Sequence, residues 1–232
     1  MTRVQAAEMV RALLGARDTS GVWTAATLNT LVNFAQRDVW RRLVAQHRQL
    51  CIVEEHKAYR AGYASEQLYV VAGGGMTTFP VEAIIGCFTT QYDAAVSATN
   101  PCWAMVNTNV SDIDRWSDNT LHSLDSGGTY RYALLGNNTL MVRPIPSGAL
   151  PVVIRYVPTP ADLDTDAKQI FGGLLFPAHD LVVRQMCILA TMRTREDNRA
   201  FREEFREAWQ AYAMTAATNP QFAEAPRNAL SD

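Results

Sequence analysis

Residues 130–160 read YRYALLGNNTLMVRPIPSGALPVVIRYVPTP, and this stretch decides the class of fold. Two runs rich in aliphatic, aromatic and β-branched residues, 130–135 and 139–143, are joined by Gly-Asn-Asn, which can adopt the positive φ angles of a tight turn. We predict a β-hairpin here and a further strand over residues 152–157. Pro-Ile-Pro and Pro-Thr-Pro should each end a strand, because proline cannot donate a hydrogen bond to a sheet ladder.

A similar composition extends upstream, which predicts a β-rich middle to the chain. Residues 68–72 and 83–90 are further strand candidates, since β-branched and aromatic residues there stand between Gly, Asn and Pro. Between Gln91 and Asp125 the sequence carries Asn and Asp but no sustained periodicity. Because compact domains rarely contain such long irregular stretches, we interpret residues 91–125 as an excursion from the sheet.

Helical periodicity dominates before this region. Thr2 and Gln5 form a capping-box pattern ahead of a short helix that ends at Gly15. Thr24 can cap a longer amphipathic helix, which should run to about His47.

Helical patterns return after residue 176. Pro177 suits the first turn of a helix that ends near Arg195, and Asp197 can cap a second helix. One face of this second helix is an aromatic stripe, a pattern typical of a core or an interface. The stripe contains Phe201, Phe205, Trp209 and Tyr212. Residues 218–232 have two prolines and one large aromatic residue, Phe222, which indicates either an extended arm or a frayed terminus.

These elements together predict an α+β fold. We expect N-terminal helices over residues 1–60, an antiparallel β-rich insert over 61–160, a C-terminal helix pair over 161–217 and an extended arm over 218–232. The helical bundle would then be built from two segments that lie far apart in the sequence.

The charge balance argues against a free-standing nucleic-acid or membrane-surface binder. The 232 residues include 21 Lys and Arg against 23 Asp and Glu, a net charge of −2, so no overall positive field exists to gather phosphates. Arg37, Arg41 and Arg48 nevertheless share one flank of the long N-terminal helix, because steps of four and seven residues return to the same side. This flank is either a solvated face or a surface for a partner's carboxylates or DNA phosphates.

No pattern in the sequence has the spacing that catalysis or metal binding requires. The four cysteines form no C-x-x-C pair, and the acidic strings after residues 111 and 161 lack the glycine and glutamate of a calcium loop. The Ser, His and Asp of residues 122–126 are adjacent in one loop, which gives no orienting geometry for a triad. We predict no catalytic, cofactor or metal site, reduced thiols, no membrane span, and synthesis in the cytoplasm.

The order of these features resembles the head-to-tail adaptor (connector) proteins of tailed bacteriophages. The resemblance is carried by FAQRDVW at residues 34–40, by YRYAL at 130–134, by LMVRPIP at 140–146, by VIRY at 153–156, and by the helix pair from Pro177 to Tyr212. It spans most of the chain, from the second helix to the C-terminal helix pair.

The resemblance implies a structural virion protein of the neck, assembled in the host cytoplasm. About a dozen copies would form a ring beneath the portal, join the capsid to the tail and line a channel through which DNA passes without sequence-specific binding. No cofactor is implied. The implied portal contacts are Phe201, Phe205, Trp209, Tyr212 and Phe222. Arg37, Arg41 and Arg48 would contact neighbouring copies or the channel, and the β-rich insert would face the next tail or stopper protein.

Two other hypotheses remain at this point. The chain could be a stopper or tail-completion protein of the same virion, which direct portal binding would distinguish. It could instead be a hydrolase or carbohydrate-binding domain that uses the excursion as a pocket rim. In that case replacing His122 and Asp125 would abolish function and leave assembly intact.

Overall fold

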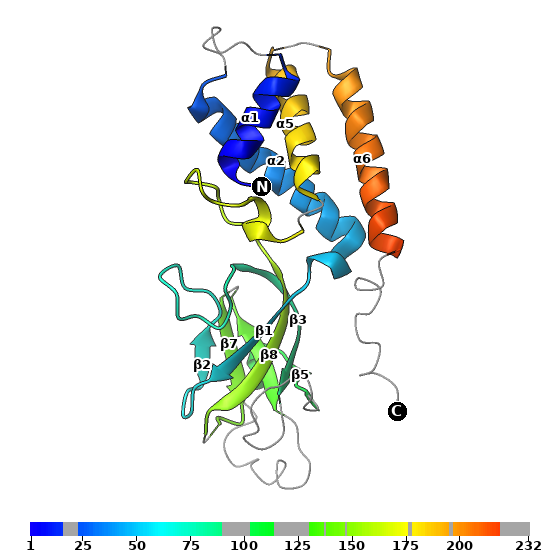
Figure 1. The fold of residues 1–232 in the computed structure, drawn as a ribbon. Helices are drawn as coiled ribbons and strands as arrows, with labels where there is room; N and C mark the ends of the chain where they lie inside the picture. The colour runs from blue at the N-terminus through cyan, green and yellow to red at the C-terminus, as the bar shows by residue number, and fades with distance from the viewer. Residues whose placement is uncertain are drawn as a thin grey trace. The chain divides into compact units, whose positions relative to one another are not determined.

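The computed structural model describes residues 1–15, 23–89, 103–113, 130–136, 138–146, 148–175, 178–194 and 197–218. The chain divides into two compact units. We call the first, Met1–Cys51 with Pro160–Asp232, the helical unit, and the second, Ile52–Thr159, the sheet unit (Figure 1). The helices and the antiparallel and mixed sheets confirm the predicted α+β class.

Both N-terminal helices begin where their capping residues predict. Helix α1 spans Arg3–Leu13, and α2 spans Ala25–His47. The capping box at α1 is complete, because the Thr2 hydroxyl accepts from the Gln5 N–H at 3.4 Å and the Gln5 side chain accepts from the Thr2 N–H at 2.9 Å. Thr24 caps α2 by accepting from the Thr27 N–H at 3.2 Å.

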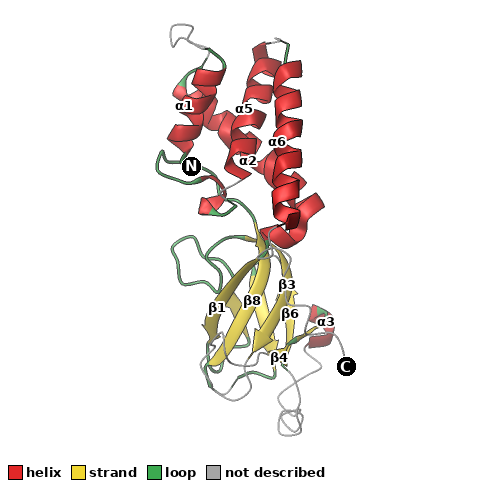
Figure 2. Cartoon of the chain, turned by 45° about the vertical axis from the view of Figure 1, so that its right-hand side comes forward, coloured by secondary structure: helices red, strands yellow, loops and turns green. Residues whose placement is uncertain are grey.

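The C-terminal helix pair is also confirmed. Helix α5 spans His179–Thr194 and α6 spans Arg199–Thr218, while Pro177 lies outside the described residues. The Asp197 carboxylate accepts from the N–H of Arg199, the first residue of α6, at 2.9 Å. Helix α5 packs against α1, α2 and α6, so it lies at the centre of the bundle, between α1 and α6 (Figures 1 and 2).

The loop that precedes α5, for which the sequence predicts no helix or strand, is held tightly against α2. It contains the 3-10 helix η4, Ile170–Gly173. Gln36, fully buried, accepts from the Phe171 N–H at 2.8 Å and donates to the Ala161 carbonyl at 3.0 Å. Phe171 takes a left-handed φ of 53°, which is costly for a bulky residue. Its ring lies against Trp40 and His179, with centroids 5.4 and 5.9 Å away.

His179 adds a pH-dependent term to the stability of this region. Burial lowers the pKa of His179, which is 2% exposed. The unfolded chain therefore binds more protons than the folded protein between the lowered pKa and the ordinary value of 6.5. We expect stability to fall as the pH drops below about 6.5, with a slope from this residue of at most about 1.4 kcal/mol per pH unit.

The measurement is chemical unfolding of wild type and His179→Gln between pH 7.5 and 5. The glutamine keeps a donor for the Leu174 carbonyl, which lies 2.9 Å from Nε2. Carboxylates and the other histidines titrate in both proteins, so their contributions cancel in the difference between the two unfolding free energies. Parallel stability curves for the two proteins would contradict the assignment.

The sheet unit contains two four-stranded sheets (Figure 2). One has the order β1-β8-β3-β4 and the other β2-β7-β6-β5, and every pairing is antiparallel except β5 with β6. The strands are β1 Val53–Tyr59, β2 Ser65–Gln67, β3 Val81–Thr89, β4 Trp103–Ala104, β5 Val106–Asn107, β6 Arg131–Leu135, β7 Thr139–Arg143 and β8 Leu150–Pro158; the short helix α3 spans Val110–Ile113.

The hairpin predicted over residues 130–143 is confirmed. Strands β6 and β7 pair antiparallel, with Tyr132 opposite Val142 and Leu134 opposite Leu140. The predicted strands at 83–90 and 152–157 correspond to β3 and β8, and β8 lies between β1 and β3. A core of buried residues that includes Tyr59, Leu140, Ile154 and Tyr156 fills this unit.

The predicted strand over residues 68–72 is wrong. The Leu68 and Tyr69 N–H groups donate to the main-chain carbonyl and the side chain of Asn138, and Gly73 N–H donates to the Val70 carbonyl. The Gly73 bond closes a turn over residues 70–73, and residues 68–72 form no strand. The strand in this region is β2, which ends just before, at Gln67.

Two other segments form strands that were not predicted from the sequence. Strand β1 was missed because its residues are mostly polar and it pairs only with β8, at the edge of its sheet. Residues 103–107, inside the predicted excursion, return to both sheets as β4 and β5, so that part of the interpretation is wrong. The remainder of 91–125, apart from 108–113, lies outside the described residues.

Candidate functional site

The aromatic stripe of α6 packs partly inside the helical unit. Phe205 is 7% exposed, and its ring stacks on Trp209 with centroids 5.9 Å apart. Trp209 Nε1–H donates to the Gln46 side chain of α2 at 2.9 Å. The Arg42 guanidinium lies 5.3 Å from the centre of the Phe205 ring, within cation–π range. These two aromatic residues therefore connect α6 to α2.

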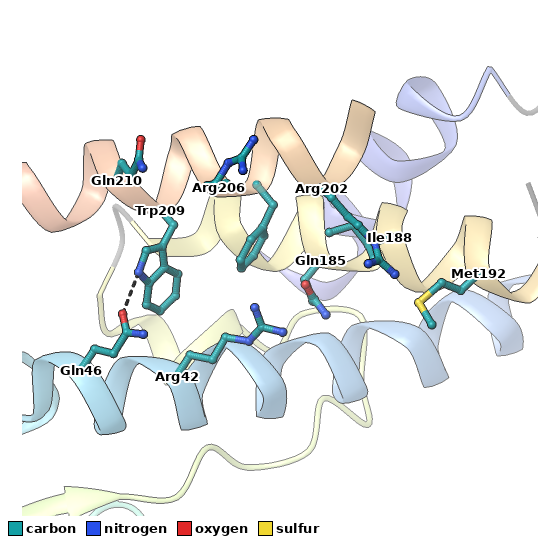
Figure 3. Close-up of a pocket in the computed structure, with 10 residues that line it drawn as sticks. Arg42, Gln46, Gln185, Ile188, Met192, Arg202, Arg206, Trp209 and Gln210 are labelled. Atoms are coloured by element: carbon teal, nitrogen blue, oxygen red, sulfur yellow. Dashed lines mark hydrogen bonds between the residues drawn. The ribbon is translucent and has the colours of Figure 1, made fainter. Parts of the chain in front are cut away.

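A groove of about 600 Å³ lies between α2, α5 and α6, and we call it the α6 groove (Figure 3). Its apolar part consists of Ile188, Met192, Phe205 and Trp209. Its polar part consists of Arg42, Gln46, Gln185, Arg202, Arg206 and Gln210. Figure 3 shows Arg42 of α2 and Arg202 of α6 extending into the space between their helices. The groove thus combines an apolar surface with concentrated positive charge.

This positive charge is only partly compensated. Arg42 pairs with Asp38 at 3.0 Å, and the same carboxylate accepts from Gln185 at 2.8 Å. Arg202 and Arg206 have no carboxylate partner within the described ranges. They are four residues apart on one helix, where two like charges repel. The α6 groove therefore favours an occupant that carries negative charge.

The three arginines of the α2 flank have different surroundings. Arg37 forms an ion pair with Asp162 at 2.5 Å, so part of its charge is used within the chain. Arg41 and Arg48 are exposed and have no ion-pair partner among the residues that the structure describes. Helix α2 ends at His47, which places Arg48 in the 3-10 helix η2, Arg48–Cys51. Two of the three candidate residues are thus available to a partner.

The other residues of the stripe, and one apolar residue beyond it, are less buried than Phe205. Phe201 and Tyr212 are half-buried, and burial raises the pKa of Tyr212 to about 12. Met214, which is not among the residues predicted from the aromatic pattern, is 70% exposed. Phe222 lies outside the described residues. The structure therefore brings Phe205 and Trp209 together and leaves the distal end of α6 with exposed apolar surface.

Metal-binding clusters are lacking among the residues that the structure describes. The described residues include no group of three or more His, Cys, Asp or Glu side chains that could hold a metal ion. Burial raises the pKa of the Cys87 and Cys187 thiols to about 12, which leaves them poor nucleophiles at neutral pH. Residues 122–126 lie outside the described part of the chain. None of the described helices is long and apolar enough to cross a membrane.

One protein-family model matches nearly the whole chain. The model of the SU10 adaptor protein family matches residues 1–228. A comparison with curated proteins gave no significant match. The family match covers both units and all the described helices and strands, and it confirms the resemblance to phage adaptor proteins. The chain belongs to the SU10 adaptor protein family.

Proposed function

We propose that this protein is the head-to-tail adaptor of its phage, a ring of about a dozen copies that joins the portal to the tail around the DNA channel. The observation that carries the proposal is the family match over residues 1–228. The partly compensated positive charge of the α6 groove and the exposed Met214 near the end of α6 support it, because a ring subunit needs complementary surfaces for its neighbours and its partners.

The portal contact is assigned to the distal part of α6 and the segment that follows it. Tyr212 and Met214 present apolar surface there, and the next residues carry Phe222. Aromatic side chains are common anchors of protein–protein interfaces. Phe205 and Trp209 contribute differently, since they hold α6 in place, and Phe201 lies at the opposite end of the stripe.

The other proposed contacts involve the exposed arginines of the α2 flank and the sheet unit. Arg41 and Arg48 serve neighbouring copies or the DNA channel, and the sheet unit faces the downstream tail or stopper protein. A net charge of −2 suits a channel wall, because a strongly basic lumen would hold phosphates by releasing counterions. DNA would pass without sequence-specific binding, and the protein would reside in the virion neck.

The test is the native mass of the purified protein, alone and mixed with the portal of its own phage. A ring of many copies bound to portal is the expected result. A protein that ignores portal but binds an already assembled neck would instead be a stopper or tail-completion protein. A protein that assembles with neither would overturn the proposal.

Truncation after Thr218 should weaken portal binding at least tenfold and leave the fold intact. The removed residues include Phe222, and a buried aromatic anchor contributes about 2 kcal/mol or more to binding. Binding is measured by titrating portal with each protein, and folding by circular dichroism. Phe222→Ala in the full chain separates the aromatic anchor from the rest of the segment. A truncated protein that binds portal with unchanged affinity would exclude the segment from the contact.

A further inference from the structure

Helix α1 has an outward face that is unusually apolar. We call Val4, Gln5, Glu8, Met9, Ala12 and Leu13 the outer α1 face, because all six are exposed. Val4 is 41% exposed, Met9 40% and Leu13 50%. A helix on the surface of a soluble protein normally directs polar residues outward, whereas here four of the six are apolar. The outer α1 face is therefore suited to being covered by another surface.

The charge on the outer α1 face is opposite to that of the α6 groove. Glu8 is exposed and has no ion-pair partner in the described part of the chain. Arg202 and Arg206 in the groove likewise have no carboxylate partner there. Both surfaces combine aliphatic or aromatic side chains with unpaired charge of one sign. Bringing them together would bury apolar area and relieve the repulsion between the two arginines.

The two surfaces also agree in length. Residues 4–13 of the outer α1 face span about 14 Å at 1.5 Å per residue, and residues 202–210 along the α6 groove span about 12 Å. A single helix can therefore follow the whole groove. Met192 of α5, which lines the groove, can adjust to it, because its flexible side chain is 53% exposed.

Within one copy the outer α1 face cannot reach the groove. Ala6, Ala7 and Val10 bury the inner face of α1 in the bundle, and α5 stands between α1 and α6 (Figures 1 and 2). The two surfaces therefore lie on different sides of the helical unit. This is the arrangement that a head-to-tail contact requires, because each copy then donates one patch and accepts the other.

We propose that α1 of one copy binds in the α6 groove of the next, with Glu8 facing Arg202. The proposal rests on the ring proposed above and names the contact that closes it. A head-to-tail contact between two different patches generates a ring when its rotation closes. The same groove holds α6 in place through Phe205 and Trp209, so subunit association would stabilise the helix that carries the portal contact.

The test blocks each surface separately. Met9→Arg places a positive charge on the outer α1 face, which the arginines of the groove repel, and Met192→Arg fills the groove with a longer, charged side chain. Both methionines are well exposed, so each monomer should fold. We expect each variant alone to lose the ring, on its own or on portal. An equimolar mixture should give a species of twice the mass of one chain, because one intact groove then meets one intact α1. A ring from either single variant would overturn the proposal.

Charge reversal tests the named pair. Glu8→Arg and Arg202→Glu should each weaken self-association at least tenfold, and the double variant should recover it. Glu207→Arg and Arg199→Glu are matched controls on α6 outside the groove and should assemble like wild type. A double variant no better than the single variants would refute the pairing.

The two proposals can fail independently. If wild type forms a ring on portal and the Met9→Arg and Met192→Arg variants do too, the α1 contact is wrong and the adaptor function stands. If wild type forms no assembly alone or with portal, the adaptor function itself is wrong.

Discussion

Replacing Phe205 with alanine will lower the free energy of unfolding of the helical unit by about 3 to 4 kcal/mol. The side chain is 7% exposed and stacks on Trp209, and the Arg42 guanidinium covers its ring. Truncation therefore removes the transfer free energy of a buried ring and leaves a cavity between α6 and α2. It also removes the aromatic surface that positions Trp209 for its hydrogen bond to Gln46.

Chemical unfolding followed by far-ultraviolet circular dichroism measures this loss, because the helical unit supplies most of the helical signal. The matched control is Phe34→Ala on α2. Phe34 is 57% exposed, so the same truncation there should cost less than about 1 kcal/mol. Equal losses for the two variants would mean that Phe205 does not anchor α6.

Replacing Gln36 with leucine will destabilise the helical unit by about 3 kcal/mol. The cause is the loss of two buried hydrogen bonds, since the volume of the side chain hardly changes. Gln36 is fully buried, and its amide satisfies the Phe171 N–H and the Ala161 carbonyl. Leucine fills similar space but leaves both backbone groups without a partner. Each buried unpaired group costs about 1 to 3 kcal/mol. Phe171 should lose its left-handed conformation, because the Gln36 bond is one of the contacts that hold it.

Unfolding measurements give the free-energy change, and amide hydrogen exchange locates it. We expect faster exchange at Phe171 in Gln36→Leu than in wild type. Gln49→Leu is the matched control, since Gln49 is exposed and makes no side-chain hydrogen bond to the described residues. A Gln36→Leu protein as stable as its control would show that the loop does not depend on this side chain.

Local signals in the sequence predicted the elements that form by local interactions. The Thr2 and Thr24 caps act within one turn of helix, so the starts of α1 and α2 could be predicted. The β6–β7 hairpin pairs residues joined by a short turn, so its register follows from the turn. The strand at Val53–Tyr59 was missed because its partner β8 lies about a hundred residues away and the edge position permits polar residues.

The candidate site could likewise be predicted only in part, because its long-range contacts leave no local signal in the sequence. The aromatic stripe of α6 could be recognised from its helical spacing, but the sequence did not distinguish Phe205, which is buried, from Met214, which is exposed. The pairing of Arg37 with Asp162 joins residues 125 positions apart, so only the structure separates Arg37 from Arg41 and Arg48. The outer α1 face is apolar in sequence, but its exposure depends on which side of α1 faces α5.

The sequence by itself determined the α+β class, the helix starts, the central hairpin and the resemblance to phage adaptors, because each depends on residues close together in the chain or on their order. The tertiary structure alone decided how the loop at 160–175 is held, which aromatic and charged side chains are buried or paired, and where the α6 groove lies. These depend on contacts between distant segments, whose geometry is set by packing of the whole unit and not by any local pattern.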